Sequence, residues 1–154
     1  MPPAPPKFGP YAAVLSPDGA RVAIGTTESK DVRFLDTATR MMTPLSLSTR
    51  GAVFFPAWSK DGTKIYAPSQ TPDTLQVYDA TTGTQLNLRE FTAAECQRPH
   101  EAVFGKSEAH VYLVCEGDRK TASHILKLDA TTLATVSVLE VGVYPDRLAI
   151  GAPP

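Results

Sequence analysis

Short apolar stretches, separated by clusters of polar residues, proline and glycine, follow one another along most of this chain. Stretches such as Arg21–Gly25, Asp31–Asp36 and His110–Val114 have the length and the side-chain types of β-strands. The 14 prolines and 10 glycines are spread between these stretches, and both residues favour turns. The pattern predicts an all-β protein of many short strands joined by tight turns.

The stretches recur in one order three times, which reveals an internal repeat. Each repeat begins with a strand, a polar turn and a second strand; in the first repeat these span Tyr11–Gly25. A third strand then ends in an aspartate, a turn follows, and a fourth strand completes the repeat. The aspartates are Asp36, Asp79 and Asp129, which lie 43 and then 50 residues apart. This spacing is typical of a four-stranded propeller blade.

We therefore predict three four-stranded antiparallel blades of a β-propeller, which together form an incomplete ring. The predicted segments are a proline-rich lead-in at 1–8, blades at about 9–52, 53–98 and 99–143, and an extra strand at 144–150. Propellers typically have about 4–8 blades. Two explanations for three blades stay open. The chain is a piece of a longer propeller, or two copies close a six-bladed ring as a homodimer.

The repeat resembles the YVTN-type β-propeller repeat, which is related to WD40-like and lactonase-like propellers. The resemblance rests on the Ser-Pro-Asp-Gly turn at 16–19, the apolar strand after it, and the Val-Tyr-Asp strand and Thr-Gly turn at 77–83. It covers roughly residues 9–143. The third repeat departs from the pattern, with Lys106-Ser107-Glu108 in place of Pro-Asp-Gly, and no repeat has the Trp-Asp dipeptide of WD40 proteins. The resemblance implies the fold, and partners such as proteins, envelope components or small ligands.

Charge and motifs exclude several classes of function. With 15 basic and 16 acidic residues the net charge is -1, and the absence of a basic stripe argues against nucleic acid as a partner. No apolar run approaches the ~18 residues of a membrane span. The chain has no Gly-x-Ser-x-Gly elbow and no glycine-rich phosphate loop, so we predict no catalytic residue and no cofactor. His110 and His124 begin outer strands away from His100, so no metal site is expected.

The candidate ligand-binding residues are Arg98, His100 and Glu101, where the first strand of the third repeat begins. First strands line the central channel of a propeller, and Arg98-Pro99-His100 resembles the Pro-His pair that precedes this strand in related propellers. Some members of that group use channel-facing residues there for ligands. Arg147 is a further candidate because it occupies the equivalent place after the third repeat. The alternative is a rim histidine that bonds to a loop carbonyl.

Other side chains have structural interpretations. Phe54, Phe55 and Trp58 form an aromatic cluster that we expect to pack between blades. The loop at 116–120 is expected to be a solvated, charged tip.

Cys96 and Cys115 are candidates for a disulfide. Pairing of Phe104 with about His110 would place Cys115 opposite Pro99 or His100, with Cys96 just beyond on the same side. The bond would close a loop of about twenty residues and contribute about 3 kcal/mol. It would also indicate an oxidising compartment. The alternative is two unrelated buried thiols.

The first hypothesis for function is a non-enzymatic binding or scaffolding module, with another protein or a second copy of itself as partner. The alternative is a fragment of a propeller enzyme, lactonase-like or quinone- and haem-associated, whose active site lies partly on missing blades. Acidic residues and histidines at the first strand of every repeat would favour the enzyme, but only the third repeat has such a pair. We expect a periplasmic or exported protein, with a cytoplasmic location as the alternative.

Overall fold

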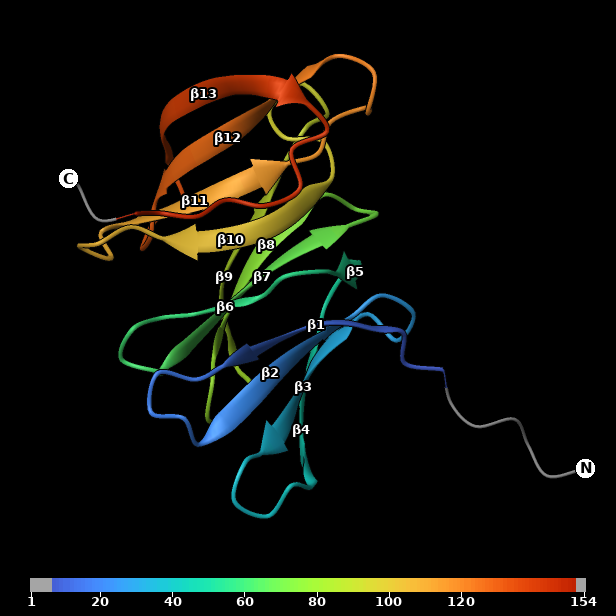
Figure 1. Ribbon diagram of the computed structural model, residues 1–154, viewed down its shortest axis with the longest axis vertical. Helices are drawn as coiled ribbons and strands as arrows, with labels where there is room; N and C mark the ends of the chain where they lie inside the picture. The colour runs from blue at the N-terminus through green and yellow to red at the C-terminus, as the bar shows by residue number, and fades with distance from the viewer. Residues whose placement is uncertain (1–6, 152–154) are drawn as a thin grey trace, which may run out of the picture.

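The computed structural model describes residues 7–151, which form three antiparallel sheets (Figure 1). The first contains β1 (Pro10–Leu15), β2 (Arg21–Thr26), β3 (Asp31–Asp36) and β4 (Met42–Ser48). The second contains β5 (Ala52–Val53), β6 (Ala57–Trp58), β7 (Lys64–Gln70), β8 (Thr74–Asp79) and β9 (Gln85–Glu90). The third contains β10 (Pro99–Phe104), β11 (His110–Cys115), β12 (Ala122–Asp129) and β13 (Thr135–Val143). The predicted all-β fold of three four-stranded antiparallel blades is confirmed.

The described residues contain no helix, and hence none that could cross a membrane. Within each sheet the strands lie side by side in sequence order, and the first strand of every sheet is its inner edge. The second sheet follows this plan although its first strand is divided into β5 and β6, both of which pair with β7.

Pro56 explains the break between β5 and β6. Proline has no backbone N–H to donate to a ladder, so it interrupts a strand. The freed backbone instead bonds to the third sheet: the Phe55 N–H donates to the His100 carbonyl at 3.1 Å, and the Ala102 N–H donates to the Phe55 carbonyl at 3.4 Å. A break in one inner strand therefore ties two blades together.

Apolar side chains fill the two interfaces between neighbouring sheets. Between the first and second sheets the core includes Phe34, Leu47, Trp58 and Ile65. Between the second and third it includes Leu75, Leu113, Leu126 and Leu128. Two buried polar side chains at these interfaces have partners, which avoids the cost of leaving them unpaired: Trp58 Nε1 donates to the Val14 carbonyl at 3.0 Å, and the Tyr66 hydroxyl donates to the Ala130 carbonyl at 2.7 Å. Trp58 thus packs between blades, as predicted.

The repeated turns owe their shape to local side-chain hydrogen bonds. Ser16 Oγ donates to Asp18 Oδ1 at 2.6 Å, and Ser59 Oγ donates to Asp61 Oδ1 at 2.6 Å. After the third strands, three aspartates accept the N–H of the threonine three residues later, which closes the turn into the fourth strand. These pairs are Asp36–Thr39, Asp79–Thr82 and Asp129–Thr132.

The predicted extra strand at 144–150 is wrong. Strand β13 ends at Val143, and residues 145–150 have no regular structure. Figure 1 shows this segment running back from the end of β13 over the third sheet. The described chain offers no second strand with which it could form a ladder, and a side chain holds it instead: the Leu148 N–H donates to Glu101 Oε2 at 2.6 Å.

Candidate functional site

Three equivalent positions, one in each sheet, meet where the inner strands converge. In β1 the pairing passes from Pro10–Thr26 to Ala12–Gly25, so Tyr11 is an extra residue. In β10 it passes from Pro99–Cys115 to Glu101–Val114, so His100 is the extra residue. Counting back from the following turn places Phe54 at the same position in the second sheet. A bulge of this kind turns a side chain out of the regular alternation of a strand.

These three side chains lie against one another. The ring centroid of Phe54 is 4.8 Å from that of Tyr11 and 4.8 Å from that of His100, while Tyr11 and His100 are 5.8 Å apart. Phe55 adds a fourth ring, 5.2 Å from His100. We expected Phe54 and Phe55 to pack between blades. Instead, their rings pack against the imidazole of His100, which is 1% exposed.

The imidazole of His100 lies between two carboxylates. Its Nδ1 is 2.6 Å from Glu116 Oε1, and its Nε2 is 3.1 Å from Asp146 Oδ1. Both ring nitrogens are buried, and despite these short distances neither forms a hydrogen bond with the described residues. Burial lowers the pKa of His100 below its usual value, although the Glu116 and Asp146 charges oppose this shift. The neutral imidazole is therefore favoured.

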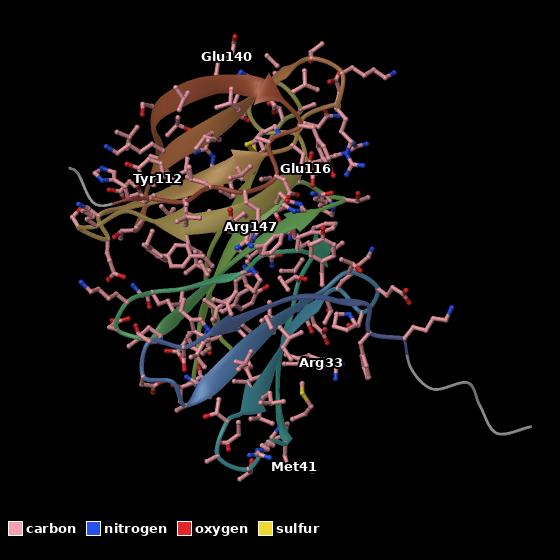
Figure 2. The ribbon with its side chains drawn as sticks, in the orientation of Figure 1. Arg33, Met41, Tyr112, Glu116, Glu140 and Arg147 are labelled. Atoms are coloured by element: carbon pink, nitrogen blue, oxygen red, sulfur yellow. A yellow bond between two sulfur atoms is a disulfide. The ribbon has the colours of Figure 1, made fainter. Side chains whose placement is uncertain are left out.

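Residues 118–120 of the predicted solvated loop at 116–120 are exposed, but Glu116 is buried and corrects the prediction at that end. Its side chain is 1% exposed, and its Oε2 accepts a hydrogen bond from Arg119 Nη2 at 2.8 Å. The Glu116 N–H donates to the Arg98 carbonyl at 3.1 Å, and the Gly117 N–H donates to the Gln97 carbonyl at 3.0 Å. These bonds extend the β10–β11 pairing past its end and turn the carboxylate of Glu116 inward (Figure 2).

Of the four candidate ligand-binding residues, three come together and one does not. Arg147 Nε lies 3.3 Å from Glu101 Oε1, and its guanidinium is 4.5 Å from the ring centroid of Phe55. The same segment brings Asp146 to His100. Arg98 contributes its backbone carbonyl to the pairing with Glu116, and its side chain forms no ion pair or hydrogen bond with the other described residues.

A pocket of about 300 Å³ lies beside the Glu101–Arg147 pair. All three inner strands line it: β1 through Val14 and Leu15, the segment with β6 through Phe55–Trp58, and β10 through Glu101–Phe104. Its walls are mostly apolar, and Leu15 is 57% exposed. The pocket therefore offers an apolar surface with one cation at its edge.

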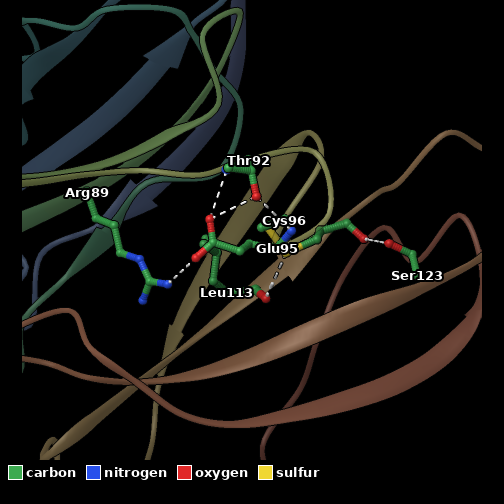
Figure 3. The surroundings of a disulfide bond; sticks show 7 residues. Arg89, Thr92, Glu95, Cys96, Leu113 and Ser123 are labelled. Atoms are coloured by element: carbon green, nitrogen blue, oxygen red, sulfur yellow. Dashed lines mark hydrogen bonds and ion pairs between the residues drawn. A yellow bond between two sulfur atoms is a disulfide. The ribbon is translucent and has the colours of Figure 1, made fainter.

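Cys96 and Cys115 form a disulfide with a Cα–Cα separation of 5.2 Å, the first of the two alternatives left open by the sequence. Figure 3 shows its surroundings: Ser123 Oγ donates to the Cys115 carbonyl at 2.6 Å, and Glu95 accepts from the N–H of Thr92 at 3.0 Å. Because Cys115 precedes Glu116, the bond anchors the strand end from which the Glu116 carboxylate projects.

Glu116 and Asp146 were missed by sequence reasoning. Asp146 immediately precedes Arg147, which the repeat had singled out, so its position alone could have suggested it. Glu116 could have been found from its position directly after Cys115. Hairpin pairing had placed Cys115 opposite Pro99 or His100, so the next residue was expected near the start of the same strand. His110 lies in β11 opposite Asp129, and His124 lies in β12 opposite Cys115. Neither histidine is part of the His100 cluster.

Comparison with known proteins supports the fold. No family model and no curated protein matches the chain. Among solved structures, it is similar to a chain of hydrazine synthase from Kuenenia stuttgartiensis, with a TM-score of 0.80 and 20% identity over 94% of this chain and 40% of that one. It is also similar to the WD40 repeats of RRP9, with a TM-score of 0.71 and 11% identity over 88% of this chain and 40% of that one.

At 20% and 11% sequence identity, these two similarities show that the fold is shared and nothing more. The chain spans 40% of the length of each of these two proteins. Neither similarity singles out the YVTN-type repeat that the sequence resembles. Together with the three sheets, the comparisons identify the chain as a β-propeller module.

Proposed function

We propose that this chain is a non-catalytic binding module that holds a protein partner in the pocket between its inner strands. The observation that carries the proposal is the pocket of about 300 Å³ that all three blades line. Such concave, mostly apolar sites with a few polar groups are where proteins bind ligands. The similarity to the WD40 repeats of RRP9 supports a propeller module and leaves the partner open.

The lining of the pocket defines the chemistry of the partner. Leu15, Phe55 and Trp58 offer apolar contact area. The Arg147 side chain is 63% exposed and its Nε is 3.3 Å from Glu101, so its guanidinium can also receive a second carboxylate. The segment recognised would therefore present an apolar side chain beside an acidic one.

A displayed peptide library, selected without added metal, tests this proposal. Trp58 lines the pocket and is the single tryptophan of the chain, so its fluorescence reports occupancy directly. Leu15→Asp should weaken binding of the selected peptides at least tenfold, since it places a charge in the apolar wall. Leu86→Asp is the matched control, because Leu86 is 50% exposed and lies outside the pocket.

The expected result is a set of apolar and acidic peptides that compete with one another and change Trp58 fluorescence. The Arg147→Ala variant should lose the preference for the acidic residue. Selection of no peptide above background would contradict the proposal, and so would equal effects of Leu15→Asp and Leu86→Asp.

We further propose that one protein partner is a second copy of the chain, which would close a six-bladed ring. The disulfide supports a periplasmic or exported location, because such bonds persist in oxidising compartments.

An enzyme component is the weaker alternative. At the position of His100 the other two blades carry Tyr11 and Phe54, and at that of Glu101 they carry Ala12 and Phe55. The second blade carries only hydrocarbon rings at these positions, so it cannot repeat the acid and base chemistry of the third blade.

A further inference from the structure

We propose that His100, Glu116 and Asp146 form a binding site for a divalent transition-metal ion, with Zn²⁺ as the preferred occupant. Each residue offers one ligand atom, and these atoms all lie within 4.8 Å of one another. None of the three ligands lines the peptide pocket, so either proposal can fail without the other.

His100 is the residue that points to a ligand, because neither ring nitrogen forms a hydrogen bond with the described residues although carboxylate oxygens lie 2.6 and 3.1 Å away. The side chain is 1% exposed, and both ring nitrogens are buried without a hydrogen bond. A buried polar atom without a partner is costly, and proteins rarely leave one in that state. An ion that accepts the lone pair of one ring nitrogen would remove this cost at that nitrogen and leave the N–H of the other to an adjacent carboxylate.

The donor set favours a first-row transition metal over Mg²⁺ or Ca²⁺. One imidazole nitrogen and two carboxylate oxygens are common ligands of Zn²⁺, whereas Mg²⁺ and Ca²⁺ prefer oxygen alone. Zn²⁺ also lies high in the order of affinities for such ligands. Cys96 and Cys115 are joined to each other, so no thiolate competes for the ion among the described residues.

The local charges leave room for a cation. Arg119 pairs with Glu116, and Arg147 pairs with Glu101. Among residues 7–151, the carboxylate of Asp146 is therefore the one acidic group of this cluster without a lysine or arginine beside it. The Asp146 side chain is 51% exposed, which gives an ion access from solvent. Water would complete the coordination on that side.

The surrounding residues hold the three ligands in place. The disulfide and the Arg98 carbonyl fix the start of the loop that carries Glu116. Glu101 binds the Leu148 N–H at 2.6 Å and so keeps the neighbouring Asp146 next to His100. The rings of Tyr11, Phe54 and Phe55 enclose the imidazole and exclude water from its inner side.

Equilibrium dialysis and calorimetry with Zn²⁺ alone test the proposal on the full chain after treatment with a chelator and its removal. We expect one ion per chain, and binding weakened at least tenfold in Asp146→Asn and in Glu116→Gln. Glu140→Gln is the control, because Glu140 lies on β13 far from Glu116, as Figure 2 shows, and should bind like the unchanged protein. Mg²⁺ at the same concentration should bind far more weakly.

Imidazole nitrogen NMR gives a readout that does not depend on affinity. Zn²⁺ should shift one ring nitrogen of His100 and leave those of His110 and His124 unchanged. Because Glu116 is buried, its variant can fail to fold; Asp146→Asn changes an exposed side chain and keeps the test decisive. No stoichiometric Zn²⁺ binding, equal binding by Asp146→Asn, or a shift at His110 or His124 alone would overturn the proposal.

Discussion

One aspartate in each of the first two inner turns accepts the hydrogen bonds that shape the turn, and these bonds lower the pKa of its carboxyl. The pKa of Asp61 is lowered to about 2, first by the hydrogen bond from Ser59 and then by those from Thr63. The Ser16 hydroxyl lowers the pKa of Asp18 in the corresponding turn of the first blade. The charged carboxylate is therefore part of the turn, and protonation removes an acceptor.

Acid should consequently weaken the fold through these turns. A carboxyl whose pKa is depressed on folding stabilises the protein above its unfolded pKa, near 3.8, and this contribution is lost as the pH falls towards about 2. We expect the urea midpoint, followed by circular dichroism, to drop over this window. In Asp61→Asn the drop should be smaller, since one titrating group is gone. A drop as large as in the unchanged protein would contradict this role of Asp61.

The candidate site was only partly predictable from single residues. His100, Glu101 and Arg147 were found because they stand at the start of a first strand or its equivalent. Glu116 looked like one charge among several in a polar loop. Its burial depends on backbone pairing with Arg98 and on the disulfide, both of which join residues distant along the chain.

The strands that pair with their neighbours in sequence were predicted well. The turns between them are encoded locally, so the order of the four strands in each sheet followed from the repeat. The segment at 144–150 failed because sequence similarity to a first strand does not supply a second strand for pairing. The division into β5 and β6 was also missed, although Pro56 was the visible signal.

The disulfide links the end of β11 to the loop that precedes β10 and should contribute to the stability of the third sheet. The two cysteines are 19 residues apart, and closing a loop of this length is worth about 3 kcal/mol. We expect the double variant Cys96→Ala, Cys115→Ala to lower the free energy of unfolding by about 2–4 kcal/mol in urea titrations.

Reduction provides the control for this comparison. A reducing agent should lower the stability of the unchanged protein and leave that of the double variant as it was. Equal stability of the two proteins under oxidising conditions would show that the bond adds nothing.

At the scale of the whole molecule, the first and third sheets each have one side that no other blade of the described residues 7–151 covers. On the first sheet this side forms a groove of about 420 Å³ lined by Phe8, Ile24, Arg33 and Met42. On the third sheet it carries the segment at 144–150, which would lie at the junction between two copies. Apolar surface of this kind is a common site of association.

We expect the chain to form a dimer in sedimentation velocity experiments over a roughly hundredfold range of concentration. Met42→Lys should shift the protein towards monomer, because it places a charge in the groove, where Met42 is 48% exposed. Leu86→Lys, at 50% exposure on β9, should not. A monomer at every concentration would exclude the six-bladed ring.

The meeting point of Tyr11, Phe54 and His100 has a consequence for any molecule bound near the axis. A ring of identical blades would offer a ligand the same contacts in several rotated poses, which makes its orientation degenerate. Here the three equivalent positions present a phenol, a hydrocarbon ring and an imidazole. A bound molecule would therefore meet the phenol and the hydrocarbon ring directly, with the imidazole of His100 buried behind them, and one rotational pose would be selected over the others.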